Sequence, residues 1–316
     1  MSTRKGLSRI VLFLWIAAVL AVGVIAILVI NTSGVDSRPI TSELTITPTL
    51  TLQPPLTATS IPLTITPLPS TPTTIPASLT PEIPQPEVIG ISVAGRPLQV
   101  YKFGNGPIEK MIIAGIHGGY EWNTIVLADE LIEYLENHPE IVPPEQTLYL
   151  LRAFNPDGYA RSTGFGGRAN ENNVDLNRNF PSYWQAEWPR AGCWDYIPIT
   201  GGTAPASEPE TRALMAFVKA HGIQAFISYH SAALGIFPGG QPPDPGSISL
   251  AESIAAVSDY PYPPIEAGCA YTGQLVDWLS DQGIPAIDIE LTNHKDSDFA
   301  KNLAILSVFL DWSYSE

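Results

Sequence analysis

From Val88 to the C-terminus, short apolar runs that favour strands alternate with longer amphipathic segments that favour helices. This alternation restricts the fold more than any other feature, because strands and helices that follow one another along a chain assemble into a sheet covered by helices. The strand-like runs are 88–93, 98–103, 110–116, 147–154, 224–230 and 286–291, and the helix-like segments are 123–137, 208–221, 249–257, 273–282 and 298–312. About 230 residues are enough for one hydrophobic core. The pattern predicts a single α/β domain with a largely buried sheet over residues 88–316.

An uncharged apolar run covers residues 10–30, and about 20 apolar residues in a helix suffice to cross a bilayer. The run is longer than the apolar region of a signal peptide and leads into no clear cleavage site, which favours an uncleaved membrane anchor. Arg4, Lys5 and Arg9 precede the run, so the positive-inside rule places residues 1–9 in the cytoplasm. We therefore expect a single-pass membrane protein whose C-terminal domain is extracytoplasmic.

Residues 31–87 are rich in Thr, Pro, Ser and Leu and contain no aromatic residue. Proline interrupts this segment too often for a helix or a central strand. At about 3.1 Å per residue in a polyproline-like conformation, some fifty residues could reach about 150 Å from the membrane. The segment is predicted to be an extended, disordered linker, and a glycosylated stalk would serve the same function.

The formal net charge of the chain is −15, and charges up to Glu87 cancel, so the excess of acids lies in the C-terminal domain. An acidic surface without a basic stripe repels phosphate backbones, which makes nucleic acid an unsuitable partner. No pattern in the sequence indicates a partner protein.

Two cysteines, Cys193 and Cys269, lie in the part of the chain expected outside the membrane, where a disulfide is chemically permitted. Spacing alone does not show that they meet, so two unpaired buried thiols remain an alternative. Neither cysteine has a second one at zinc-finger spacing, which argues against a cysteine metal site.

Polar side chains follow four of the expected strands. His117 and Glu121 follow the run at 110–116, an Asn-Pro-Asp-Gly segment follows 147–154, and His230 and Glu290 lie at the ends of the last two strands. Ligands of open α/β sheets collect at such strand ends. A catalytic zinc takes three His or carboxylate ligands, and His117, Glu121 and His230 supply that set. A single histidine at a strand end is more often structural, so the prediction of a zinc site depends on the three residues occurring together.

Residues 173–180 (NVDLNRNF) place an acid, several amides and an arginine in one short run with little helical or strand pattern. Arg178 can bind a carboxylate through two hydrogen bonds and Asn177 can add amide hydrogen bonds, which together suit a free peptide C-terminus. The alternative is an Asn-rich and Asp-rich loop that satisfies its own backbone.

Together these motifs resemble the zinc carboxypeptidases of the carboxypeptidase A-like family. The matching motifs are the His and Glu at 117 and 121, NPDG at 155–158, DLNRNF at 175–180, FISYHS around His230 and IELT around Glu290, and the resemblance covers about residues 95–315. It implies a three-layer α/β/α fold with a mostly parallel mixed sheet.

The resemblance also implies roles for individual residues. His117, Glu121 and His230 would bind one Zn²⁺ per chain. Glu290 would be the general base that takes a proton from water, and Arg168 would polarise the scissile carbonyl.

For the substrate, the resemblance implies that Asn177 and Arg178 hold the terminal carboxylate and that Asp175 orients a ligand histidine. Tyr271 is a candidate for the family's mobile tyrosine, although it aligns only after a shift, and it could equally be an aromatic of the pocket wall. Val276 matches the position that selects the substrate side chain. An apolar residue there argues against a preference for C-terminal Lys or Arg, unless the neighbouring acid at 277 points inward.

One departure from the family pattern concerns the metal site. The family usually has two residues between the first His and the Glu, whereas His117 and Glu121 are separated by three. The metal geometry is then expected to be adjusted.

The sequence therefore predicts a zinc-dependent carboxypeptidase that removes neutral or non-basic C-terminal residues from extracytoplasmic peptides, either free peptides or the stem peptides of a cell wall. A deacylase of N-acyl amino acids is an alternative, because such enzymes have a similar Asp-Leu-Asn-Arg run. A zinc-free, inactive surface binding module is another, suggested by the longer His117–Glu121 spacing. The presence of Glu290 and Arg168 beside the metal ligands argues against it.

Overall fold

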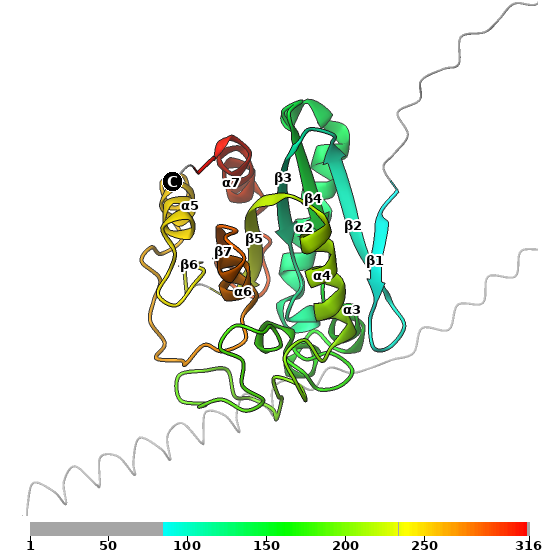
Figure 1. Ribbon diagram of the computed structural model, residues 1–316, viewed down its shortest axis with the longest axis vertical. Helices are drawn as coiled ribbons and strands as arrows, with labels where there is room; N and C mark the ends of the chain where they lie inside the picture. The colour runs from blue at the N-terminus through cyan, green and yellow to red at the C-terminus, as the bar shows by residue number, and fades with distance from the viewer. Residues whose placement is uncertain (1–84, 233, 315–316) are drawn as a thin grey trace, which may run out of the picture. The chain divides into compact units, whose positions relative to one another are not determined.

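The computed structural model describes residues 85–232 and 234–314 (Figure 1). The predicted cytoplasmic segment 1–9, the predicted membrane span 10–30 and the linker up to residue 84 lie outside these residues. Among the helices of the described part, none has the length and apolar character needed to span a membrane.

One mixed sheet of seven strands forms the centre of the domain, in the order β1-β2-β4-β3-β5-β7-β6. The strands are β1 (Glu87–Ile91), β2 (Pro97–Gly104), β3 (Ile108–Ile113), β4 (Gln146–Leu151), β5 (Ile223–Ser231), β6 (Ile236–Pro238) and β7 (Ala286–Leu291). The four central strands β4, β3, β5 and β7 are parallel. β1 and β2 at one edge and β6 at the other are antiparallel to their neighbours. The sheet is therefore mixed, as the sequence predicted, with its parallel strands at the centre.

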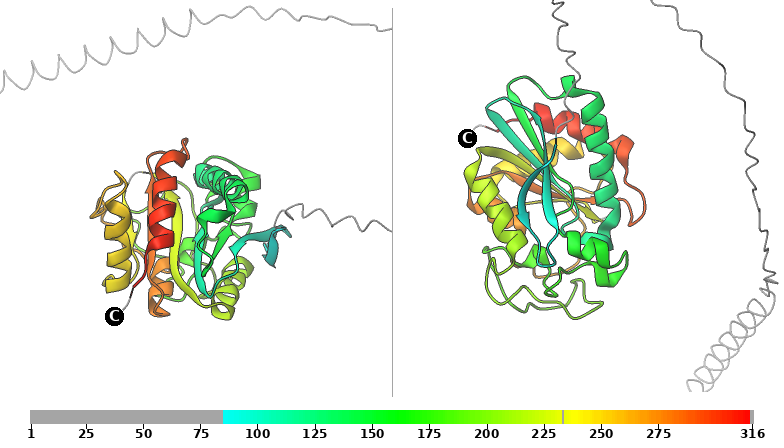
Figure 2. Two further views of the ribbon diagram at one scale, coloured as in Figure 1. Left: turned by 90° about the horizontal axis from the view of Figure 1, so that it is seen from above. Right: turned by 90° about the vertical axis from the view of Figure 1, so that its right-hand side faces the viewer.

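Helices cover both faces of the sheet and complete three layers (Figure 2). The side chains of α2 (Trp122–Asn137), α5 (Pro245–Ala255) and α7 (Phe299–Asp311) share one hydrophobic cluster with one face. Those of α4 (Pro209–Ala220) and α6 (Leu275–Asp281) share a second cluster with the other face. The parallel strands are buried on both sides, which explains why they appear in the sequence as continuous apolar runs.

Several boundaries differ from the predicted ones for local reasons. The helix expected at 249–257 begins at Pro245, because Asp244 accepts a hydrogen bond from the Ser247 amide and proline suits the first turn. The strand expected at 110–116 ends at Ile113, since the chain turns at Gly115 with φ +66°. Strand β6 was not predicted, because three residues are too few to show a periodic pattern.

The loops at the carboxyl ends of the parallel strands contain short helices. These are η1 (Gly118–Glu121) after β3, α3 (Pro156–Arg161), η3 (Phe165–Gly167) and η4 (Leu176–Arg178) after β4, whereas η2 (Pro139–Ile141) lies after α2. At the same edge the register of β5 and β7 pairs His230 with Glu290. These loops and strand ends hold the candidate site.

Candidate active site

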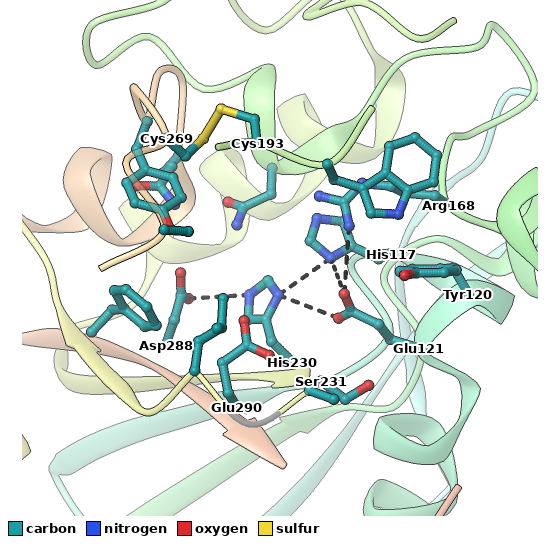
Figure 3. Close-up of a pocket in the computed structure, with 18 of the residues that line it drawn as sticks. His117, Tyr120, Glu121, Arg168, Cys193, His230, Ser231, Cys269, Asp288 and Glu290 are labelled. Carbon is teal, nitrogen blue, oxygen red and sulfur yellow. Dashed lines mark hydrogen bonds and ion pairs between the residues drawn. A yellow bond between two sulfur atoms is a disulfide. The ribbon is translucent and has the colours of Figure 1, made fainter. Parts of the chain in front are cut away.

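Three buried side chains meet at this edge of the sheet (Figure 3). Glu121 Oε1 lies 2.7 Å from His117 Nδ1, and His230 Nδ1 lies 3.3 Å from His117 Nδ1 and 3.4 Å from Glu121 Oε2. One ligand atom from each residue falls within 4.8 Å of the others. The structure thus brings together the three residues that the sequence predicted as metal ligands.

The additional residue between His117 and Glu121 is accommodated by η1, a single 3₁₀ turn. Gly118 adopts the left-handed region with φ +47°. A Cβ on Gly119 would lie 2.0 Å from the carbonyl oxygen of Ser162, so only glycine fits there. The turn brings the Glu121 carboxylate back to His117, so the longer spacing does not separate these two candidate ligands.

This donor set fits a zinc ion. Two imidazole nitrogens and one carboxylate are the ligands of many catalytic zinc sites, which keep a further position for water. Glu121 Oε2 is buried and has no hydrogen-bond partner among the described residues. Burial alone would raise the pKa of Glu121, but the rings of His117 and His230 hold it well below its usual range, so the carboxylate is ionised as a metal ligand must be.

The outer nitrogens of both histidines face acids. His117 Nε2 lies 3.3 Å from Asp175 Oδ1, and His230 Nε2 lies 3.2 Å from Asp288 Oδ1 and 3.0 Å from Ser228 Oγ. Such contacts fix the ring orientation and direct the Nδ1 atoms toward the centre. Asp175 was predicted for this position, whereas Asp288 and Ser228 were not. Asp288 lies two residues before Glu290 on β7, and Ser228 lies two residues before His230 on β5. Alternate residues of a strand lie on the same face, so this spacing could have identified both side chains from the sequence.

Arg168 lies beside the donor set on the segment after η3. Its Nε donates to Asp175 Oδ2 at 2.9 Å, and its Nη1 lies 3.5 Å from Glu121 Oε1. The guanidinium also lies over the Trp194 ring, 4.9 Å from the centroid. Asp175 therefore orients both a ligand histidine and this arginine.

Glu290 lines the cavity at the end of β7. Loss of solvent and the nearby Glu121 carboxylate raise its pKa to about 8, while His230 acts in the opposite direction. Its Oε2 has no hydrogen-bond partner among the described residues. A carboxyl with these properties can accept a proton and return it near neutral pH.

Asn177 and Arg178 lie on η4 and line the same cavity. Arg178 Nη1 donates to the Asn177 carbonyl at 2.7 Å, and Nη2 lies 3.9 Å from Cys269 Sγ. The buried Nε has no acceptor among the described residues. The Asn177 side-chain oxygen accepts from the Leu275 amide at 2.9 Å, which fixes the orientation of the amide. A buried guanidinium with an unpaired donor suits an anionic ligand.

The two remaining substrate candidates differ in position. Tyr271 lines the cavity with its ring 5.6 Å from the Arg178 guanidinium. Val276 packs in the core between α6 and the sheet and does not line the cavity, so its prediction as the selector of the substrate side chain is wrong. Val276 lies on the face of α6 that packs against the sheet, and the sequence alone does not show which face of that helix does so. Asp277 accepts hydrogen bonds of 2.9 and 2.7 Å from residues 240–241 and likewise faces away.

Cys193 and Cys269 form a disulfide that joins two loops of the cavity wall (Figure 3). The cavity has a volume of about 520 Å³. Besides the predicted residues its lining includes side chains that the sequence did not single out, namely Tyr120, Trp194, Tyr196, Phe237, Gln274, Asp288 and His294. They come from loops and strand ends without a periodic pattern. His294 Nδ1 lies 2.9 Å from Ser231 Oγ.

Comparisons with known proteins point to the family of zinc carboxypeptidases. The sequence profile of zinc carboxypeptidases matches residues 77–304. Murein peptide amidase A of Escherichia coli K12 is 28% identical over 239 residues, which cover 72% of this chain and 90% of the amidase. Gamma-D-glutamyl-L-diamino acid endopeptidase 1 of Lysinibacillus sphaericus is 28% identical over 243 residues, covering 64% of this chain and 59% of that protein. The solved murein-tripeptide amidase of Escherichia coli O157 has a similar fold, with a TM-score of 0.53 and 24% identity over 74% of this chain and 94% of the amidase.

Proposed function

This chain belongs to the zinc carboxypeptidase family, and from this premise we propose that it removes the C-terminal residue of extracytoplasmic peptides in a zinc-dependent reaction. One observation carries the proposal. The buried Arg178, whose Nε has no acceptor among the described residues, lines the same cavity as the group formed by His117, Glu121 and His230. A site for a terminal carboxylate beside a site for a hydrolytic metal is the arrangement that an exopeptidase needs.

In this proposal His117, Glu121 and His230 hold the zinc ion. Zinc, when bound, supplies Lewis acidity that polarises a carbonyl and makes water a stronger acid.

The remaining steps use side chains of the chain itself. Glu290 accepts the proton of the attacking water and returns it to the departing amine. Arg168, held by Asp175, donates hydrogen bonds to the oxygen of the scissile carbonyl as negative charge develops there. Arg178 and Asn177 bind the terminal carboxylate, and Tyr271 lies beside Arg178 in the cavity wall.

The proposed substrates are stem peptides of a cell wall. Two relatives are named for murein peptides and for gamma-D-glutamyl-L-diamino acid bonds. The predicted membrane anchor and linker would hold the domain outside the cell, within reach of such peptides. The predicted restriction to non-basic residues rested on Val276, which lies in the core, and is not retained.

A Glu290→Gln variant tests the proposal. Full-length wild-type and variant protein are compared for zinc content and for release of C-terminal amino acids from free and wall-derived peptides. We expect about one zinc per chain in both proteins and a rate reduced by about 10²–10⁴-fold in the variant, the range typical of a lost general base. Glu252→Gln, at an exposed position of α5, is the matched control and should retain full activity. Full activity of Glu290→Gln, or a zinc-loaded wild type that releases no C-terminal residue, would contradict the proposal.

A further inference from the structure

Arg178 is held by few hydrogen bonds, although its side chain is buried. Its Nη1 donates to the carbonyl oxygen of the preceding residue, Asn177, at 2.7 Å, and its Nη2 lies 3.9 Å from Cys269 Sγ. The Nε has no acceptor among the described residues. Because an arginine side chain is long and flexible, one strong hydrogen bond to a neighbouring carbonyl does not fix the plane of the guanidinium. Other contacts must set its direction.

Trp188 supplies such a contact. The Arg178 guanidinium lies over the Trp188 ring, 5.3 Å from the centroid. Tryptophan is the aromatic side chain that attracts a cation most strongly, and the attraction increases where both groups are removed from water. Trp188 is 5% exposed and is not one of the residues that line the cavity. It therefore contacts the arginine from behind the cavity wall, where a ligand in the cavity does not touch it.

The surroundings of Trp188 indicate that its ring, rather than its N–H group, is the part in use. The indole Nε1 is buried and has no hydrogen-bond acceptor among the described residues. A buried donor without an acceptor is costly, and a phenylalanine would pack without that cost. A residue that is locally unfavourable in this way indicates a functional position, and here the contact that remains is the one between the ring and Arg178.

Trp188 is itself held in place by two kinds of contact. Its side chain packs with Ala169 and Ile199 in a small hydrophobic cluster. The Arg190 guanidinium lies over the same ring, 3.8 Å from the centroid, and Arg190 Nη2 donates to the Ile199 carbonyl oxygen at 2.6 Å. Trp188 and Arg190 thus form a fixed surface for the Arg178 guanidinium.

We infer that Trp188 is a positioning residue that holds the Arg178 guanidinium in the direction needed to bind a terminal carboxylate. The inference rests on the proposed carboxypeptidase function, since it takes Arg178 as the carboxylate site. Trp188 touches no substrate in this arrangement and acts only through Arg178. Trp194, further along the same loop, lies over the Arg168 guanidinium at 4.9 Å. The loop therefore provides one ring for each of the two arginines of the candidate site.

The test compares two ligands that differ only in the carboxylate. Binding of phenylacetate and of phenylacetamide to the zinc-loaded full-length protein is measured by calorimetry. We expect the wild type to bind phenylacetate more tightly by about tenfold or more, and Arg178→Gln to lose most of this preference, because one desolvated charge pair is removed. Trp188→Leu should reduce the preference to about threefold or less, whereas Trp188→Phe, which keeps an aromatic face, should retain most of it.

Peptide hydrolysis supplies a second measurement. Trp188→Leu should raise KM by about tenfold and leave kcat within about threefold, because the terminal carboxylate is bound equally in the substrate complex and in the transition state. Trp184→Leu is the matched control, since Trp184 lies on the same loop and its Nε1 makes a hydrogen bond of 2.9 Å to the Gly201 carbonyl oxygen rather than a cation contact. It should retain the wild-type KM and the preference for phenylacetate.

Arg190→Gln is a second variant that leaves Trp188 in place and removes the cation on its ring. It should reduce the preference for phenylacetate by about threefold. Zinc content and urea unfolding measured on every variant separate loss of metal or of the fold from loss of carboxylate binding.

The outcomes distinguish this inference from the proposed function. An unchanged preference and an unchanged KM in folded, zinc-loaded Trp188→Leu, beside a lost preference in Arg178→Gln, would overturn the inference and leave the carboxypeptidase intact. Equal or absent binding of the two ligands by the wild type would overturn the carboxylate site and the inference together. A reduced preference in Trp188→Leu without cleavage of any peptide by the wild type would overturn the peptidase and support the positioning role.

Discussion

At the scale of single residues, the site is organised by buried acids that contact the two candidate ligand histidines. Asp175 contacts both His117 Nε2 and Arg168 Nε, so one side chain sets the direction of a metal ligand and of the arginine expected at the carbonyl. Asp288 contacts His230 and borders the cavity. Both acids are buried, which keeps their effect on neighbouring charges strong.

Asp277 provides a prediction about pH and stability. Burial raises the pKa of Asp277 from 3.8 to about 6, against hydrogen bonds from Gln241 and the Gly240 amide that lower it. Between these two pH values the Asp277 carboxyl keeps its proton in the folded state but has lost it in the unfolded state. The contribution of Asp277 to stability is therefore fully present below the unfolded pKa and is lost as the pH rises through the folded pKa. We expect the free energy of unfolding of the wild type to fall by about 2.4 kcal/mol between pH 4 and pH 7 relative to Asp277→Asn.

Urea unfolding of both proteins at several pH values measures this difference. Asp244→Asn serves as a control substitution. The Asp244 carboxylate caps α5 and accepts a hydrogen bond from the Ser247 amide, as the Asp277 carboxylate accepts hydrogen bonds from its own neighbours. Parallel curves for wild type and Asp277→Asn across the acid range would show that the Asp277 pKa is not raised.

At the scale of secondary-structure elements, every strand of the described sheet except the three-residue β6 was predictable, and the loops of the candidate site were only partly so. Buried parallel strands appear in the sequence as apolar runs, and five helix-like segments were found at positions that α2, α4, α5, α6 and α7 occupy. The short elements η1, η3 and η4 were not predicted, because three or four residues contain no period. These short elements nevertheless set the distances between the site residues.

The η1 turn allows a test at this scale. A Cβ at position 119 would lie 2.0 Å from the Ser162 carbonyl oxygen, so Gly119→Ala must displace the turn between His117 and Glu121. We expect zinc affinity to fall by about tenfold or more, because one of three protein ligands is moved. Equilibrium competition with a zinc chelator measures the change.

Gly164→Ala is the control for that substitution. Its Cβ would lie 3.5 Å from Ser162 Oγ, an ordinary contact, and Gly164 has φ −113°, which alanine readily adopts. Its zinc affinity should equal that of the wild type. Equal affinity of the two alanine variants would show that the turn does not position Glu121.

At the scale of the whole molecule, the three layers bring strand ends to one edge, and a single disulfide joins two loops above that edge. Cys193 and Cys269 are 76 residues apart in the sequence and belong to loops on the cavity wall. Cys269 Sγ also lies 3.9 Å from Arg178 Nη2. The disulfide therefore links the fold to the side chain that we propose binds the terminal carboxylate.

Replacing both cysteines with alanine tests this link. A chain-entropy estimate for a loop of this length gives about 4 kcal/mol of lost stability. We expect a lower melting temperature, a higher KM for peptides and unchanged zinc content, because the ligands lie on other segments. Thiol titration of denatured, unreduced wild type should find no free thiol, and two free thiols per chain would contradict the bond.

The sequence by itself determined the α/β fold class, the order of the main strands and helices, and the three residues that converge at the candidate metal site. Strand periodicity and the position of polar residues at strand ends are local features of the sequence, so they can be recognised without knowledge of the fold. Only the tertiary structure decided that Val276 is buried, that Asp288 and Ser228 contact His230, and that His294 and the aromatic side chains line the cavity. These positions depend on helix orientation, on the register between β5 and β7 and on the paths of loops, which are set by packing across the whole domain.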